Sequence, residues 1–345
     1  MDPRPPPAPW APNPASWPDA LLDVFDRSIT TEYASLTRNG RPVTVPTTPY
    51  RGRDGWTIDV STGLTYPAKA ERARRDPRVC LLFADPVGSG LVDPPVVLVQ
   101  GLATVRDADL QANTDRYVRV SMEKLPAATK GQPRFALRRL GWYYARIWIE
   151  VTPLHIRWWP SRQLDVPART WEAPAGTAAP LSDPAPSGSQ PAAWLAPPVS
   201  WRDVAQAAIG RLALHDLTVV DDNGFPAGLP VRRTELVDGG FSLELGPGAP
   251  GLAGGPACLT MHAHPESFTG QENRTFVGTV EAVDSGGGTV RFHAERALAD
   301  WSLSGGRAGT AVRFLSKRRR LSPRLAAEAQ RRFQPVPEVR LPTRH

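Results

Sequence analysis

The 345-residue chain contains only two cysteines, Cys80 and Cys258, and lacks any apolar run as long as the roughly 20 residues of a membrane helix. So few cysteines exclude a disulfide-rich scaffold. Each cysteine opens an apolar strand-like run, which predicts a buried free thiol in place of a disulfide or a metal ligand. The first residues, Met1–Pro7, hold no apolar signal core, so we expect a cytoplasmic protein without a membrane partner.

Proline and glycine, in contrast, are abundant, with 38 and 29 residues, and they gather in particular segments. Residues 1–18 are predicted to form a Pro-rich tail and residues 161–198 a linker, because neither composition can bury a core. At roughly 150 residues per domain, the chain holds about two domains. We predict these domains at 19–160 and 199–316, followed by a basic C-terminal helix or tail at 317–345.

Positive charge is in excess, because 41 Lys and Arg face 34 Asp and Glu, which gives a net charge of +7. This excess favours an anionic partner, such as a phosphate-bearing cofactor or a nucleic acid. The basic runs at 317–320 and 331–332 are typical of a solvated surface. Aromatic residues do not interleave with these runs, so nucleic-acid binding ranks last among the functions considered.

The chain repeats itself with a long period. Asn39–Pro46 returns 184 positions later as Asn223–Pro230, and in both copies Asn-Gly between apolar runs predicts a tight β-hairpin. An amphipathic helix precedes each hairpin, and the second helix begins with the capping-box-like pattern Ser200–Asp203. Two strand-rich copies with tight turns predict small antiparallel barrels.

The copies differ after their third strand. In the first copy, Pro67 opens a helix that carries Lys69 and Arg72 on one face. In the second copy, the Gly/Pro-rich segment 246–256 cannot hold a stable helix. A helix start offers free N–H groups and the positive end of its dipole, so the first copy alone is predicted to bind a phosphate. A solvated basic helix is the alternative.

These elements occur in the order of a known family. A hairpin with Asn-Gly-Arg-Pro, a third strand, the Lys69 helix and the run Asp76–Phe83 together resemble the pyridoxamine 5'-phosphate oxidase-like FMN-binding split-barrel family. The resemblance covers residues 20–158 and is most specific from Lys69 to Phe83. It implies a mainly β fold with helices, built as two tandem split β-barrels joined by a Pro-rich linker, with the second copy degenerate.

The resemblance further implies a flavoprotein, an FMN-dependent oxidoreductase that transfers hydride to or from a small organic substrate. The cofactor would carry the chemistry, so no catalytic residue is predicted. A deazaflavin coenzyme is an alternative to FMN, and a non-catalytic protein that binds flavin or haem is another, since a fold does not set a function. The two barrels would pair within a monomer, or with those of a second chain in a homodimer.

The residues that the resemblance assigns to the cofactor are Thr47, Thr48, Ser61, Thr62, Tyr66, Lys69, Arg72 and Gln100. Lys69 and Arg72 would contact the phosphate. Ser61 and Thr62 would donate hydroxyl groups, and Tyr66 would lie near the cofactor's chain. Thr47 and Thr48 fall where the second strand follows the flavin ring.

The chain also departs from the family pattern. Gln100 stands directly before Gly101, whereas the family's oxidase keeps its glutamine farther back. The oxidase has an arginine and a lysine along its second strand, where this chain has Val43–Thr48, so pyridoxamine phosphate is not expected as the substrate. Arg232 or Arg233 of the second copy could reach the site across the interface between the barrels.

Two further patterns allow more than one interpretation. His262 and His264 lie on one face of a predicted strand, a spacing that a metal ion could use. No third ligand is evident nearby, so no metal site is predicted. The aromatic run Trp142–Tyr144 could stack on a cofactor ring or pack between the elements of a barrel, and both alternatives stay open.

Overall fold

The computed structural model describes residues 17–53, 55–129, 132–188, 199–268, 270–286, 288–298, 319 and 321–342. Residues 1–16 of the predicted tail, residues 189–198 of the predicted linker, and Lys317, Arg318 and Arg320 lie outside the described residues. No helix in the described ranges is long and apolar enough to cross a membrane.

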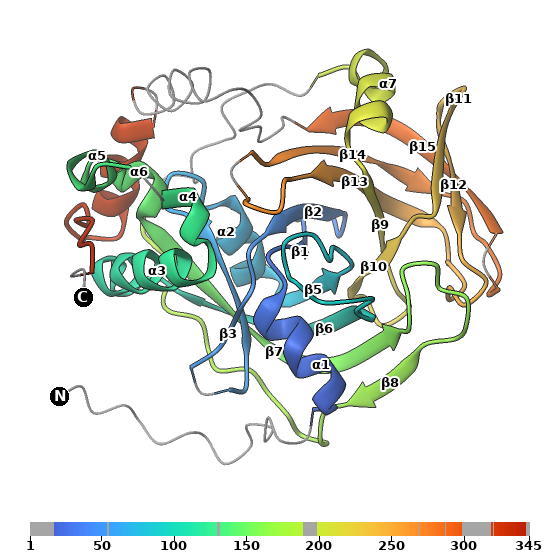
Figure 1. Ribbon diagram of the computed structural model, residues 1–345, viewed down its shortest axis with the longest axis horizontal. Coiled ribbons are helices and arrows are strands. Elements are labelled where there is room, and N and C mark those ends of the chain that lie inside the picture. The colour runs from blue at the N-terminus through green and yellow to red at the C-terminus, as the bar shows by residue number, and fades with distance from the viewer. Residues whose placement is uncertain are drawn as a thin grey trace.

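The first half of the chain forms one antiparallel sheet that curves into a split barrel (Figure 1). Its strands are β1 (Thr31–Leu36), β2 (Pro42–Thr47), β3 (Tyr50–Arg51), β4 (Ile58–Gly63), β5 (Arg78–Phe83), β6 (Val96–Arg106), β7 (Arg146–Trp159) and β8 (Arg169–Glu172). The strand order is β2-β1-β5-β6-β7-β4-β3, and β8 pairs with β7. The helices are α1 (Asp19–Arg27), α2 (Ala68–Arg75), α3 (Leu110–Lys124), α4 (Pro126–Thr129), α5 (Arg134–Arg138) and α6 (Gly141–Tyr144).

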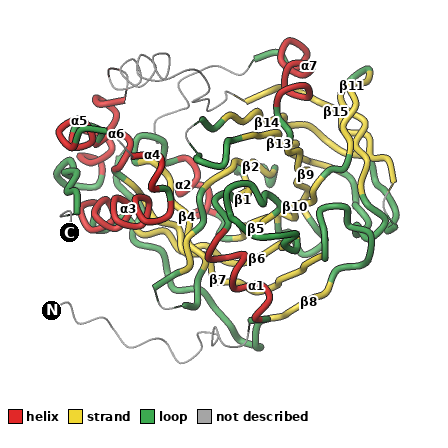
Figure 2. The backbone as a smooth tube through the Cα atoms, in the orientation of Figure 1, coloured by secondary structure: helices red, strands yellow, loops and turns green. Residues whose placement is uncertain are grey.

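The second half repeats this topology. It contains α7 (Trp201–Arg211), β9 (Leu214–Val220), β10 (Pro226–Pro230), β11 (Arg233–Val237), β12 (Gly240–Leu245), β13 (Gly255–Ala263), β14 (Glu272–Val280) and β15 (Gly288–Leu298). The strand order, β10-β9-β13-β14-β15-β12-β11, matches the first sheet strand for strand. The prediction of two tandem split barrels is confirmed. Figure 2 shows most helices on the side of the first barrel, whereas α7 accompanies the second.

The repeated hairpins form as predicted. β1 pairs with β2 and β9 pairs with β10, both antiparallel. Gly40 and Gly224 turn the chain with φ angles of 70° and 77°, a conformation that glycine adopts at little cost because it has no Cβ. Cys80 and Cys258 are buried free thiols, as predicted, and burial raises the pKa of Cys80 to about 12.

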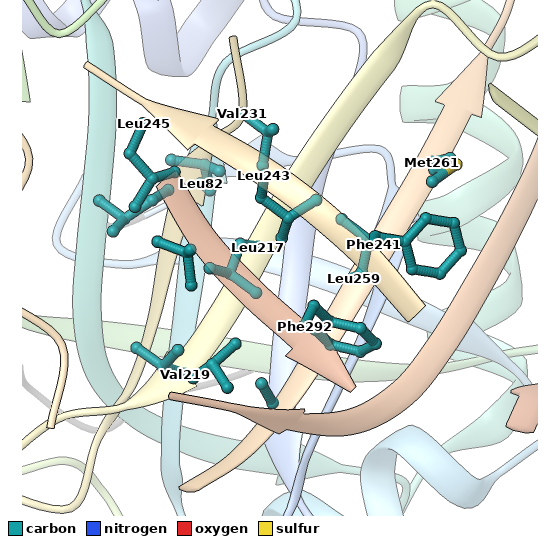
Figure 3. Close-up of a cluster of buried hydrophobic side chains, with 14 of the residues drawn as sticks. Leu82, Leu217, Val219, Val231, Phe241, Leu243, Leu245, Leu259, Met261 and Phe292 are labelled. Atoms are coloured by element: carbon teal, nitrogen blue, oxygen red, sulfur yellow. The ribbon is translucent and has the colours of Figure 1, made fainter. Parts of the chain in front are cut away.

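The two barrels contact each other in a reciprocal way. β2 contacts β9, β13 and β14 of the second barrel, and β10 contacts β1, β5 and β6 of the first. This exchange corresponds to an approximate two-fold relation between the barrels. Leu82 of β5 belongs to the same buried cluster as Leu217 and Leu245 of the second barrel (Figure 3). The hydrophobic core therefore continues from one barrel into the other.

Both chain ends are packed more closely than their composition indicates. Trp17, which belongs to the predicted tail, is buried, and its ring lies 5.4 Å from that of Phe25. Residues 321–331 form a helix, and Leu321, Leu325 and Ala329 join the core of the first barrel. Each end contributes apolar side chains that the polar and Pro-rich residues around them conceal in the sequence.

The predicted solvated surface at residues 331–332 is wrong. Arg332 is buried and pairs with Asp107 at 2.9 Å and with Glu71 of α2 at 3.2 Å. Arg331 pairs with the same Glu71 at 2.9 Å. The run reads as a solvated face because its acidic partners lie 225 to 261 residues away in the sequence.

The predicted linker is partly ordered against the first barrel. β8 pairs with β7, and Trp171 of β8 packs on the first barrel's core. Farther along, the Val105 N–H donates to Ser182 Oγ at 2.9 Å, and the Asp107 N–H donates to Asp183 Oδ2 at 2.7 Å. Short motifs inside a Pro-rich stretch can thus dock even though the stretch has no periodic pattern.

The second helix starts differently from its prediction. Ser200 makes no side-chain cap hydrogen bond at the start of α7, so the capping box does not form. The chain instead enters the helix from a β-bridge between Val199 and Ala297. This bridge fixes the direction of the backbone without a capping side chain.

Candidate functional site

Helix α2 follows directly on the turn after β4. Pro67 precedes its first residue, and Ala70 and Ala73 are buried in the core of the first barrel. Thr62 Oγ1 donates to the backbone oxygen of Tyr66 at 2.8 Å, which holds the turn together. The helix contacts β1, β6 and β7, so that its start lies against the barrel wall (Figure 1).

Three cationic side chains interact at this turn: Lys69 and Arg72 of α2 and Arg146 of β7. We refer to them as the cation cluster. Burial lowers the pKa of Lys69 to about 7, and the positive charges of Arg146 and Arg72 add to this effect. Burial also lowers the pKa of Arg72. In the described part of the chain, none of the three forms an ion pair with a carboxylate.

Neutral groups hold the cation cluster in place. Arg72 Nε donates to Ser35 Oγ of β1 at 2.9 Å. Arg146 Nη2 donates to the Tyr117 hydroxyl at 2.9 Å, and its guanidinium lies 4.1 Å from the centre of the Tyr117 ring. A cation–π contact of this kind fixes a guanidinium without neutralising it.

Two buried polar atoms at the cluster have no hydrogen-bond partner. They are the Thr65 hydroxyl and Arg146 Nε, and both lie near Gly63: a Cβ added to Gly63 would be 3.2 Å from Arg146 Nη1 and 3.7 Å from Thr65 Oγ1. Buried polar groups without a partner are costly. A bound anion would satisfy them and supply the missing negative charge beside the start of α2.

The predicted cofactor residues do not all gather at this point. Lys69 and Arg72 belong to the cation cluster, and Tyr66 lies next to Gly63, with its ring 3.8 Å from the position of an added Cβ. Ser61 and Thr62 are neighbours on β4, so their side chains point to opposite faces of the sheet. Ser61 lies opposite Trp148 of β7.

Thr47 and Thr48 lie far from the cluster along the barrel. Thr47 is opposite Thr31 at one end of β1, while Arg72 binds Ser35 near the other end. Four residues of a β-strand span roughly 13 Å. These threonines and the cation cluster could therefore contact opposite ends of an elongated ligand, but not the same group.

Gln100 lies at the contact between the barrels. It is buried, and its amide nitrogen donates to Asp221 Oδ2 at 2.8 Å and to the backbone oxygen of Pro226 at 3.1 Å. Both amide hydrogens are used to hold the second barrel's hairpin. The structure thus places Gln100 in the interface and not with the cation cluster.

The second barrel does not bring Arg232 or Arg233 to the cluster. Arg232 Nε donates to Gln163 Oε1 at 2.9 Å. Arg233 is exposed on β11, an edge strand of the second sheet, and pairs with Glu235 at 2.6 Å. The expectation that they reach the site is wrong because β11 lies at the edge opposite to β10, the strand that meets the first barrel.

The residue that the sequence prediction missed at the cation cluster is Arg146. The register of β4 and β7 pairs it with Gly63, and such a register cannot be derived from either strand alone. The aromatic run Trp142–Tyr144 belongs to packing: Trp142 joins the first barrel's core, and Tyr143 and Tyr144 surround Tyr117 at ring distances of 6.3 and 6.1 Å.

A second group of polar residues is buried between the barrels. Glu32 and Asp216 lie beside His262, and Asp85 lies beside His264. The sequence prediction found no third ligand for the two histidines because these carboxylates come from other strands. One signal was present: Glu32 and Asp216 are 184 positions apart, the period of the repeat.

Comparison with known proteins supports the fold. No protein-family model matches the chain, and no curated protein is similar at the sequence level. Similar solved structures include an F420 reductase (15% identity, 41% of this chain and 98% of that one, TM-score 0.31). A conserved hypothetical protein, Rv2991 from Mycobacterium tuberculosis, has 22% identity over 47% of this chain and 95% of its own, with a TM-score of 0.33.

A third similar structure is described as belonging to the pyridoxinephosphate oxidase family. It is a protein from Clostridium acetobutylicum related to general stress protein 26, with 13% identity over 44% of this chain and 89% of its own, and a TM-score of 0.30. Each structure covers less than half of the chain. The solved structures that this chain is similar to thus include pyridoxine phosphate oxidase-family proteins, as the sequence resemblance predicts, and the likeness is one of fold.

Proposed function

We propose that the protein is a flavin-dependent oxidoreductase that binds the phosphate of FMN, or of a deazaflavin coenzyme, at the cation cluster. The observation that carries this proposal is the group of Lys69, Arg72 and Arg146 without an ion-pair partner among the described residues. Like charges repel one another when buried, so such a group suits a site that is completed by an anion.

The residues of the cluster fit a phosphate group. Lys69 and the two arginines would supply positive charge, the Thr65 hydroxyl would donate a hydrogen bond, and the first N–H groups of α2 are free of partners within the helix. A dianion beside Lys69 would raise the pKa of its ammonium group from about 7, so that the lysine would be protonated in the complex.

A bound flavin would supply the hydride chemistry, and the protein would supply position and electrostatics. Thr47 and Thr48, half-buried at the far end of β2, are proposed to contact the part of the cofactor remote from its phosphate. We also propose that one chain is sufficient for the site, because the second barrel already occupies the first barrel's interface.

The absorption spectrum of the purified protein tests the class of cofactor. A two-band flavin spectrum supports FMN, a single deazaflavin band supports the related coenzyme, and a Soret band would indicate haem. Reduction of the bound flavin, followed by rapid reoxidation by a small quinone or nitro compound, would support an oxidoreductase. A colourless protein that takes up neither FMN nor a deazaflavin would overturn the proposal.

Substitutions on α2 test the site itself. Lys69→Ala should weaken FMN binding roughly tenfold to a hundredfold, since a hydrogen bond to a charged group contributes about 1.5–3 kcal/mol. Arg75→Ala is the matched control, because Arg75 lies on the same helix but is exposed, and it should change the affinity less than twofold. Equal affinities for both variants and the wild type would place the phosphate elsewhere.

A further inference from the structure

Five buried atoms without hydrogen-bond partners meet between the two barrels. They belong to Glu32 of β1, Asp216 of β9 and His262 of β13, whose side chains are at most 1% exposed. The atoms are both carboxylate oxygens of Glu32, Oδ2 of Asp216, and both ring nitrogens of His262. Unpaired buried polar atoms are rare in folded proteins, so their convergence at one point calls for a missing partner.

The spacing of these atoms fits a metal ion. His262 Nε2 lies 2.8 Å from Glu32 Oε1 and 3.6 Å from Asp216 Oδ2. One ligand atom from each residue lies within 4.8 Å of the others. In a tetrahedral site with bonds of 2.0–2.1 Å, neighbouring ligand atoms are about 3.3 Å apart. The observed distances bracket this value, and the 2.8 Å contact lacks hydrogen-bond geometry.

Neighbouring groups orient the three side chains. Arg162 Nη2 donates to Asp216 Oδ1 at 3.0 Å, which leaves Oδ2 free. On the other side of the imidazole ring, His262 Nδ1 lies 3.9 Å from Asp85 Oδ2. Asp85 is itself held by His264 Nε2 at 2.7 Å and by the Val87 N–H at 2.9 Å. A carboxylate behind a histidine ligand is the usual support of a metal-bound imidazole.

The charge of the cluster also calls for a cation. Burial raises the pKa of Glu32 to about 7, and the adjacent carboxylate of Asp216 adds to the rise. Two carboxylates that face each other away from water repel one another unless positive charge lies between them. A divalent ion would supply that charge to both carboxylates at once.

The repeat explains how the site arose at this place. Glu32 pairs with Leu82 on β5, and Asp216 pairs with Thr260 on β13 in the same register. The two carboxylates are therefore equivalent residues of the two copies and meet where the barrels face each other. Two positions after Leu82 the first copy has Ala84, whereas two positions after Thr260 the second copy has His262.

We propose that Glu32, Asp216 and His262 bind one divalent transition-metal ion, which joins the first barrel to the second. One imidazole nitrogen and two carboxylate oxygens suit Zn²⁺, Mn²⁺ or Fe²⁺. The ion would be structural, because its ligands are buried and come from both barrels. The site shares no residue with the cation cluster and does not depend on the proposed oxidoreductase function.

Metal analysis of the full, untagged chain tests the proposal. Protein stripped with a chelator and then dialysed against Zn²⁺ or Mn²⁺ should retain one equivalent per chain of at least one of these ions by mass spectrometry of the elements. Its melting temperature should rise by several degrees on reconstitution, because an ion that binds only the folded state stabilises it. Failure of the stripped wild type to retain either ion would overturn the proposal.

Variants locate the ion. Glu32→Gln and His262→Gln should each bind Zn²⁺ at least tenfold more weakly in competition with a chromophoric chelator. His293→Gln is the matched control, since His293 is exposed and lies 2.7 Å from Glu281, and it should bind as the wild type does. Zn²⁺ binding that is unchanged in His262→Gln, or that is lost in His293→Gln, would contradict the assignment. If the buried variants do not fold, the reconstitution of the wild type still decides.

Discussion

The two barrels share one strand order but end their third long strand in opposite ways. In the first, β4 leads into α2 and the cation cluster. In the second, β12 leads into the loop 246–256, where the chain's own linker is packed: the Gly248 N–H donates to the Leu164 oxygen at 2.6 Å, and Trp159 Nε1 donates to the Gly248 oxygen at 3.1 Å. One copy thus keeps a place for an anion, while the other fills the equivalent place with its own backbone.

This difference shows how a duplicated barrel can specialise. The strands that build the interface are kept in both copies, and the change is confined to one loop and one helix. The second barrel then serves the first as a permanent partner in the same chain. The comparison predicts that substitutions after β4 change ligand binding, whereas substitutions after β12 change stability.

The largest expected effect concerns the support of α2. Arg332 is buried among Asp107, Glu71 and Glu328, and the loss of one partner from a buried ion network costs about 3–5 kcal/mol. Arg332→Ala should lower the free energy of unfolding by this amount in urea denaturation. Arg340→Ala, in an exposed pair with Asp115, is the control, and an equal effect of the two would show that the buried network does not hold the helix.

The next effect concerns the closed loop of the second barrel. A Cβ on Gly248 would overlap the backbone oxygen of Val166, so Gly248→Ala should destabilise the protein by about 1–3 kcal/mol, the usual cost of overpacking. FMN affinity, measured under conditions where the variant is folded, should stay the same. A stable Gly248→Ala variant would show that the linker does not fill this place tightly.

A smaller effect follows from the charge of Lys69. Its pKa of about 7 means that the free protein loses this charge as the pH rises from 6 to 8, and FMN affinity should fall by up to roughly tenfold per pH unit above 7. The stability of the ligand-free protein should rise over the same range, because the unfolded lysine binds a proton more tightly than the folded one. Lys69→Arg should remove both dependences, and a pH profile that this variant leaves unchanged would assign the titration to another group.

The smallest effect on stability should come from Gly63→Ala. An added Cβ there would lie 3.2 Å from Arg146 Nη1, the end of a flexible side chain that can move away, so the free energy of unfolding should change by less than about 1 kcal/mol. FMN affinity should nevertheless fall, because Arg146 would leave the cluster. Together with Gly248→Ala, this variant separates binding from stability, and the reverse outcome for the pair would break the comparison.

Local features of the fold could be predicted from the sequence, because local patterns determine them. The Asn-Gly turns, the Pro67 start of α2 and the apolar strand at Cys80 all formed as expected. Features that depend on register or on the placement of the barrels could not. Arg146 reaches the cluster only through its pairing with Gly63, and Gln100 is turned to Asp221 by the second barrel.

Charge patterns were the least reliable guide to the site. Arg331 and Arg332 look like a solvated run but are buried against acidic residues from the first barrel. Glu32 and Asp216 lie in ordinary strands, and only the repeat period connects them. Buried polar contacts between distant segments have no local signature, which is why these pairs emerged only from the folded chain.

The central claim is that two barrels of one chain share a single anion-binding cofactor site. Equilibrium titration of the full chain with FMN, followed by flavin fluorescence, tests this claim most directly, with a deazaflavin coenzyme as the parallel probe. The account predicts saturation at one cofactor per chain and loss of this binding in Lys69→Ala. Saturation at two per chain, or binding that does not depend on Lys69, would contradict it.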